Sequence, residues 1–172
     1  MPSLSTAPYR EGGCPRALLL LLTFLLTLLA WVSPAQAATG DTYVRRYLRA
    51  GDGVTLPADA AGRPQTFTAA DLSAGKKLFE ETCLNCHVGG ATLPNPLVSL
   101  SLTDLQGATP PRDNIAALAA FIRNPQTYDG LEPSATCRQL SARWTTDGEV
   151  EQLAAFVLRA AQVAPGWGTK KF

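Results

Sequence analysis

The sequence is short of the side chains that usually bind metal ions. Among 172 residues it has one histidine, His87, one methionine, which is Met1, and four cysteines. A structural zinc site takes four nitrogen or sulfur ligands in most proteins. This chain can barely assemble four such ligands, so its composition argues against a zinc protein.

The chain also lacks an excess of charge of either sign. It carries 15 basic and 14 acidic side chains, which gives a formal net charge of +1. This balance suggests neither a nucleic-acid partner nor a polybasic contact with a membrane. The content of apolar residues, 46%, is that of a globular chain and not of a disordered one. The length fits one domain, and no internal repeat is found.

One long hydrophobic run occurs, and it lies near the N-terminus. Two arginines precede an uncharged, Leu-rich run from Ala17 to Val32, and Ala35-Gln36-Ala37 follows shortly after it. These are the features of a secretory signal with an A-x-A cleavage site. A transmembrane anchor is the alternative, but a span needs about 20 apolar residues. We predict a signal peptide over 1–37 and one mature domain over 38–172.

Two of the three cysteines in the predicted mature domain lie beside the histidine. The string Cys83-Leu84-Asn85-Cys86-His87 matches C-x-x-C-H, the attachment signature of haem c in an exported chain. Two cysteines three apart on one helical turn point to the same side, where thioether bonds can reach both vinyl groups of one porphyrin edge. The next residue then lies over the ring face. We predict one covalent haem c, attached to Cys83 and Cys86, with His87 as the proximal axial ligand.

A thioredoxin-like redox pair is the main alternative for a bare C-x-x-C string. It has no need of His87 directly after the second cysteine, and the surrounding sequence lacks the alternating strands and helices of that fold. Structural disulfides are common in exported proteins. However, the mature domain has an odd number of cysteines, so a disulfide framework does not account for all of them.

The mature domain contains several segments with helical periodicity. Residues 68–71 (TAAD) and 146–149 (TDGE) have the form of capping boxes, which start helices. Between them, Asn124-Pro125 ends a helix. Tyr43-Val44 and residues 64–67 are candidates for short strands in a small hairpin. The predicted helices cover residues 69–83, 101–106, 113–123 and 147–161.

Gly75 lies in the interior of the first long predicted helix, where glycine costs about 1 kcal/mol relative to alanine. A close backbone approach by another helix would account for it. We predict that the last helix crosses there, with Phe156 or a neighbour opposite Gly75. The predicted fold is an all-α monohaem cytochrome c with a small N-terminal β-hairpin or irregular segment. Haem would be the largest component of its core.

Several strings of the mature domain are more specific than C-x-x-C-H alone. They are Cys83–Gly90 followed by Pro94-Asn95-Pro96, Ala108–Ile115, Asn124–Gly130, and Trp167-Gly168 with Lys170 and Lys171. These strings resemble the cytochrome c subunit of photosystem II, called extrinsic protein V, over about Thr66 to Phe172. The resemblance implies an all-α cytochrome c on the lumenal side of the oxygen-evolving complex.

The sequence departs from that family at the second axial ligand. The family has a distal histidine several residues after the TYDG turn, and Cys137 stands at the matching position. A cysteine there resembles the divergent second copy of the extrinsic cytochrome in some cyanobacteria. Methionine and a second histidine, the usual sixth ligands, are missing from the mature chain. The remaining candidates are Cys137, Lys76, Lys77 and an open or water-occupied position, but both lysines lie on the helix before the attachment site, on the wrong side to reach the distal face. Cys137 could instead be a buried apolar residue.

The expected function follows from this ligation. A thiolate stabilises ferric iron, so we expect a low-potential electron carrier or a stabilising extrinsic subunit on the lumenal side of photosystem II. Its partners would be lumenal photosystem II subunits, with peripheral membrane association through them and no nucleic acid. The alternatives are a structural subunit whose haem serves folding, and a haem sensor or peroxidase-like enzyme with an open site. The signal implies export to the thylakoid lumen or the periplasm.

We expect the protein made by an exporting host to be soluble and to begin at Ala38. The reason is the short apolar run followed by the small-residue site at Ala35-Gln36-Ala37. Mass spectrometry of the purified protein gives its N-terminus. An intact N-terminus in a carbonate-resistant membrane fraction would show that the run is an anchor.

Overall fold

The structure is a computed structural model that describes residues 20, 24, 40–93, 95 and 97–169. The predicted signal peptide lies outside these residues except for Leu20 and Phe24, as do Pro94, Pro96 and the C-terminal residues from Lys170 onward. The boundary after Ala37 stays a prediction. Across the described ranges, no helix combines the length and the apolar character that crossing a membrane requires.

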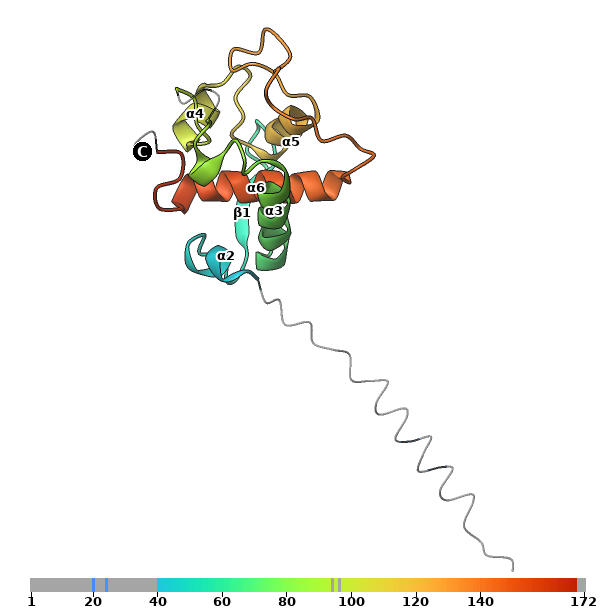
Figure 1. Cartoon of the computed structure of the whole chain (residues 1–172). Helices are drawn as coiled ribbons and strands as arrows, with labels where there is room; N and C mark the ends of the chain where they lie inside the picture. Colours follow the sequence, from blue (N-terminus) through green and yellow to red (C-terminus); the bar gives the residue numbers. More distant parts are fainter. Residues whose placement is uncertain (1–19, 21–23, 25–39, 94, 96, 170–172) are drawn as a thin grey trace, which may run out of the picture. The chain divides into compact units, whose positions relative to one another are not determined.

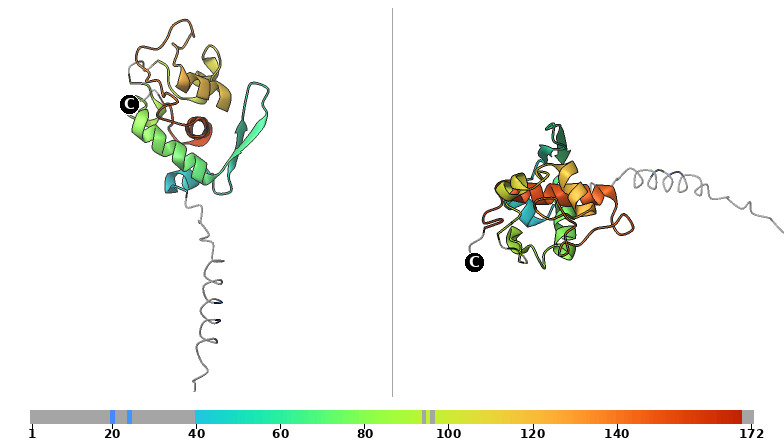
Figure 2. Two further views of the ribbon diagram at one scale, coloured as in Figure 1. Left: turned by 90° about the vertical axis from the view of Figure 1, so that its right-hand side faces the viewer. Right: turned by 90° about the horizontal axis from the view of Figure 1, so that it is seen from above.

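The domain after Ala37 is mostly helical, with one two-stranded antiparallel sheet (Figure 1). This confirms the predicted all-α fold with a small N-terminal hairpin. Helix α6 runs through the domain, and both α3 and α5 pack against it (Figure 2). The elements are α2 (Thr42–Arg46), β1 (Val54–Pro57), β2 (Pro64–Phe67), α3 (Ala69–Thr82), a 3₁₀ turn (Val88–Gly90), α4 (Leu102–Gly107), α5 (Ile115–Arg123) and α6 (Asp147–Val163).

The hairpin pairs β1 with β2, from Val54 opposite Phe67 to Pro57 opposite Pro64. The prediction of a strand over Pro64–Phe67 is confirmed, whereas that of a strand at Tyr43-Val44 is wrong, because both residues lie in α2. The Asp41 carboxylate accepts hydrogen bonds from the backbone N–H groups of Tyr43 and Val44, and this cap starts a helix.

The caps predicted for the two long helices are present. Thr68 with Asp71, and Thr146 with Glu149, exchange reciprocal bonds between side chain and backbone at the starts of α3 and α6. Helix α5 begins at Ile115, two residues later than predicted, because Asn114 is its N-cap. The Asn114 side-chain oxygen accepts a hydrogen bond from the backbone N–H of Ala117. The predicted turn at 101–106 is α4, capped by Ser101.

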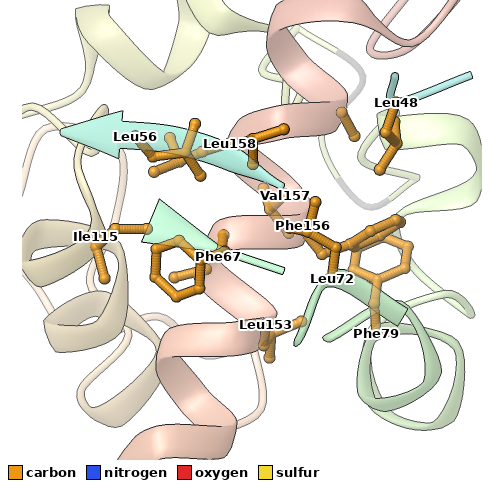
Figure 3. Packing of buried hydrophobic residues seen from close by; sticks show 14 of the residues in the cluster. Leu48, Leu56, Phe67, Leu72, Phe79, Ile115, Leu153, Phe156, Val157 and Leu158 are labelled. Carbon is orange, nitrogen blue, oxygen red and sulfur yellow. The ribbon is translucent and has the colours of Figure 1, made fainter. Parts of the chain in front are cut away.

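The backbones of α3 and α6 meet at Gly75. A Cβ atom placed there would overlap the carbonyl oxygen of Gln152, so only glycine fits this crossing. The predicted approach is confirmed, but the residue opposite is Gln152 and not Phe156, which lies one turn further along α6. Phe156 instead packs on Phe79, with ring centres 5.4 Å apart. Figure 3 shows both rings beside Leu72 in the core.

We expect Gly75→Ala to destabilise the holoprotein by about 1–3 kcal/mol, because the added methyl group overpacks the crossing. Urea denaturation followed by circular dichroism measures this change. Gly148→Ala is the matched control, since Gly148 lies in the exposed first turn of α6 and, beyond its chain neighbours and its own helix backbone, no atom lies within 4 Å of the place that its new methyl group would take. That change should be neutral or slightly stabilising. Equal losses in both variants would contradict the role of the close approach.

Candidate haem site

A cavity of about 330 Å³ is bounded by the end of α3, the connection from α3 to α4, helix α5 and the segment that precedes α6. The three cysteines of the predicted mature domain all line it, together with His87. Cys83, Cys86 and His87 come from one short stretch, while Cys137 comes from a distant part of the sequence. Much of the remaining wall is apolar and includes Phe79, Leu105, Leu118, Phe121, Leu153 and Val157.

The C-x-x-C-H string forms a tight turn at the end of α3. Cys83 is the C-cap of that helix. The backbone N–H groups of Cys86 and His87 both donate to the Cys83 carbonyl, over 3.1 and 2.9 Å. These bonds hold the two cysteines within a single turn that lines the cavity. The turn has the form that attachment of one porphyrin edge requires.

The imidazole of His87 is oriented by the residues that follow it. Its Nδ1 lies 3.0 Å from the Ala91 carbonyl oxygen and 3.2 Å from the Thr92 hydroxyl. Burial lowers the pKa of His87, so the ring is neutral at pH 7. A carbonyl can only accept, so Nδ1 carries the proton and Nε2 keeps a free lone pair for a metal. Sequence reasoning missed these two partners, which occupy positions without a recognisable motif.

Two glycines turn the chain back over His87. Gly89 and Gly90 have φ angles of 58° and 81°, in the left-handed region that favours glycine. A Cβ atom at Gly90 would lie 2.6 Å from the Trp167 ring. The backbone N–H of Gly168 donates to the Gly89 carbonyl over 2.8 Å. The two strings at 89–90 and 167–168, which are far apart in the sequence, therefore pack on each other.

Cys137 faces the cavity from an otherwise exposed stretch. Between residues 131 and 139, Ser134 and Cys137 are half-buried and their neighbours are exposed. The backbone N–H of Cys137 donates to the Ser134 hydroxyl over 3.1 Å. Its thiol is free, and within the described chain it belongs neither to the apolar core nor to the half-buried residues packed on that core. Cys137 therefore lines the cavity and is not packed into the apolar core.

The environment of Cys137 keeps an uncoordinated thiol protonated. Burial raises its pKa to about 11, with a smaller opposing effect from the positive charge of Arg112. Binding to a metal ion removes the proton from a thiol outright. The sulfur would therefore be an anionic donor only when it is bound to iron.

Two arginines bring positive charge to the wall of the cavity. Arg112 lies over the Phe121 ring, 4.0 Å from its centre, and donates to the Thr127 carbonyl over 2.6 Å. Arg138 lies over the Trp144 ring at 4.7 Å. Both arginines line the cavity. Guanidinium groups bind carboxylates well, so these two could offset the negative charge of the haem propionates.

The lysine alternative for the distal ligand is not supported. Lys76 is held on the outside of α3 by Asp41 and Glu80, over 3.2 and 2.7 Å. The Lys77 ammonium lies 3.9 Å from Glu81. Neither lysine lines the cavity.

This donor set fits haem c. Two thiols lie on one turn, an imidazole offers its Nε2 atom, and a third sulfur lines the same apolar cavity. When bound, haem supplies an iron that gains or loses one electron. Such a cavity in a helical domain defines the class of c-type cytochromes. The chain belongs to the cytochrome c-550 family, whose domain matches residues 48–172, and it carries covalently bound haem c.

Known relatives cover most of the domain. The cytochrome c-550-like protein of Thermosynechococcus vestitus is 60% identical over 152 residues, which are 86% of this chain and 87% of that protein. Photosystem II extrinsic protein V of Gloeobacter violaceus is 50% identical, over 93% of this chain and 91% of its own. The crystal structure of the PsbV2 cytochrome from Thermosynechococcus elongatus aligns with a TM-score of 0.75 and 62% identity, over 76% and 99% of the two chains.

We expect replacement of both Cys83 and Cys86 by serine to abolish covalent haem retention, because no thioether bond can then form. With the haem lost from its apolar cavity, the double variant should be largely unfolded. Acid-acetone extraction measures retention, and circular dichroism measures folding. Cys137→Ser is the matched control and should keep its haem through extraction. Full retention by the double variant would overturn the assignment of the attachment residues.

Proposed function

We propose that this protein is a low-potential c-type cytochrome that carries electrons on the lumenal side of photosystem II. Cys83 and Cys86 attach its haem, His87 is the proximal ligand and Cys137 is the distal ligand. The observation that carries the proposal is the position of Cys137, which lines the cavity that His87 and the attachment turn also line. The proposed mature domain is 38–172, after removal of a signal peptide over 1–37.

Ligation on both faces of the iron favours electron transfer over catalysis. An iron with two protein ligands has no free position for a substrate. A thiolate donates more electron density to the ferric ion than to the ferrous ion, and this lowers the reduction potential. The half-buried position of Cys137 also limits the access of water to that sulfur.

The family relationship supports association with photosystem II. The relative from Gloeobacter violaceus is named photosystem II extrinsic protein V. The N-terminal sequence supports export, and the lumenal side of the thylakoid membrane is the compartment in which such a protein would meet photosystem II. We propose that the protein attaches there peripherally, through lumenal subunits.

A structural role for the haem is the second candidate. Leu118, Leu153 and Val157 belong to the buried core and also line the cavity. Haem would therefore complete the hydrophobic core of this domain, in addition to carrying an electron on its iron. Only one of the two roles requires Cys137. Folding around haem depends on the apolar surface of the haem, whereas electron transfer depends on its reduction potential, which the distal ligand sets. An open-site sensor or peroxidase-like enzyme would instead bind cyanide or CO readily in its resting state.

We expect the oxidised protein to be low-spin, with a sulfur-to-iron charge-transfer band. Cys137→Ser should convert it to high spin and raise its potential, because a weak neutral donor replaces the thiolate. Cys137→His should give a bis-histidine spectrum. Absorption and electron paramagnetic resonance spectra with a redox titration measure these changes.

The control for these variants is Gln139→Ala, which alters an exposed neighbour of Cys137 and should leave spectrum and potential unchanged. The proposal fails if Cys137→Ala retains both the ferric spectrum and the potential of the wild type. Cys137 would then be a packing residue only.

A further inference from the structure

The segment that carries Cys137 is hydrogen-bonded at both ends to the last turn of α5 and the residues just after it. The backbone N–H of Ser134 donates to the Pro125 carbonyl over 2.9 Å. The backbone N–H of Leu140 donates to the Ile122 carbonyl over 3.2 Å. Cys137 lies midway between these two attachments, in a stretch without helix or strand. The place of its sulfur therefore depends on how firmly both ends are held.

Arg123, the last residue of α5, reinforces the downstream attachment. Its Nη1 donates to the Leu140 carbonyl over 2.8 Å and to the Thr145 hydroxyl over 2.9 Å. Its Nη2 donates to the Thr145 carbonyl over 2.9 Å and to the Asp147 carboxylate over 2.7 Å. One guanidinium thus joins the end of α5, the residue three positions after Cys137, and the start of α6.

The hydrogen bonds from Arg123 to backbone carbonyls hold the segment more strongly than its ion pair with Asp147 does. The Asp147 side chain is 91% exposed, and an ion pair with so exposed a partner contributes little. The Arg123 side chain is only 22% exposed, and both Leu140 and Thr145 are buried. Bonds from a charged group to partly buried carbonyls are stronger than neutral ones. Arginine presents five N–H donors in a fixed planar fork, whereas the three donors of an ammonium group all belong to one nitrogen atom.

We infer that Arg123 is the positioning residue for the distal ligand, because it holds the segment after Cys137 so that the sulfur stays in the cavity. The inference rests on the proposed ligation by Cys137. Without Arg123, the Leu140 and Thr145 carbonyls lose their charged donor, and one backbone bond remains between Leu140 and α5. The segment then opens more often, and an external ligand captures the iron more often.

The test measures how fast imidazole displaces the thiolate from the ferric holoprotein, by stopped-flow absorption. We expect Arg123→Met to react about tenfold faster or more, as the loss of charge-assisted hydrogen bonds implies. Arg159→Met is the matched control. Arg159 is also half-buried and donates to a backbone carbonyl, that of Leu48 over 2.8 Å, but this carbonyl lies outside the segment that carries Cys137. This control should lose stability and keep the wild-type rate.

A second variant keeps the test decisive if Arg123→Met does not fold. Arg123→Lys retains the charge and loses the fork, so hydrogen exchange at the amides of Cys137 and Leu140 should be faster than in Arg159→Lys. An unchanged imidazole rate, or equal acceleration in both methionine variants, would overturn the role of Arg123 while leaving Cys137 as the ligand. A wild-type ferric spectrum without the sulfur-to-iron band would overturn both proposals.

Discussion

The close contact between the backbone of α3 at Gly75 and the Gln152 carbonyl of α6 is the constraint on which the rest of the domain depends. Any side chain at that position would push the two helices apart. One turn beyond Gly75, Phe79 packs on Phe156 and on Trp167, at 5.4 and 5.5 Å between ring centres. The next turn is the end of α3, where Cys83 begins the C-x-x-C-H turn. The crossing therefore fixes the haem-binding end of α3 relative to the core.

The two halves of the site are built in different ways. The proximal half is local, because His87 is oriented by Ala91 and Thr92 within one turn of chain. The distal half is non-local, because Cys137 reaches the cavity from a segment bonded to the end of α5. A locally built half keeps its geometry through small movements of the domain. The distal half moves with its attachments, which would suit the proposed bond between Cys137 and iron, because a thiolate binds ferrous iron more weakly than ferric iron.

Much of the fold could be predicted from the sequence because its signals are local. The boxes that begin at Thr68 and Thr146 start α3 and α6 where predicted, since the bonds that form them lie within one helical turn. The helix at Tyr43-Val44 escapes prediction because two apolar residues have no periodicity, and the Asp41 cap decides for a helix. Gly75 predicts a close approach, but not that Gln152 lies opposite, because the register of two helices depends on packing along their whole contact.

The sequence by itself determined the C-x-x-C-H turn, the helices that support it and the candidate ligands. These depend on spacing within a few residues and on the scarcity of histidine and methionine. Only the tertiary structure decided that Cys137 lines the same cavity as His87. The bonds that bring Cys137 there join backbone groups and the Arg123 guanidinium to carbonyls. Every residue has such a carbonyl, so no pattern of side chains in the sequence marks the ones that are used.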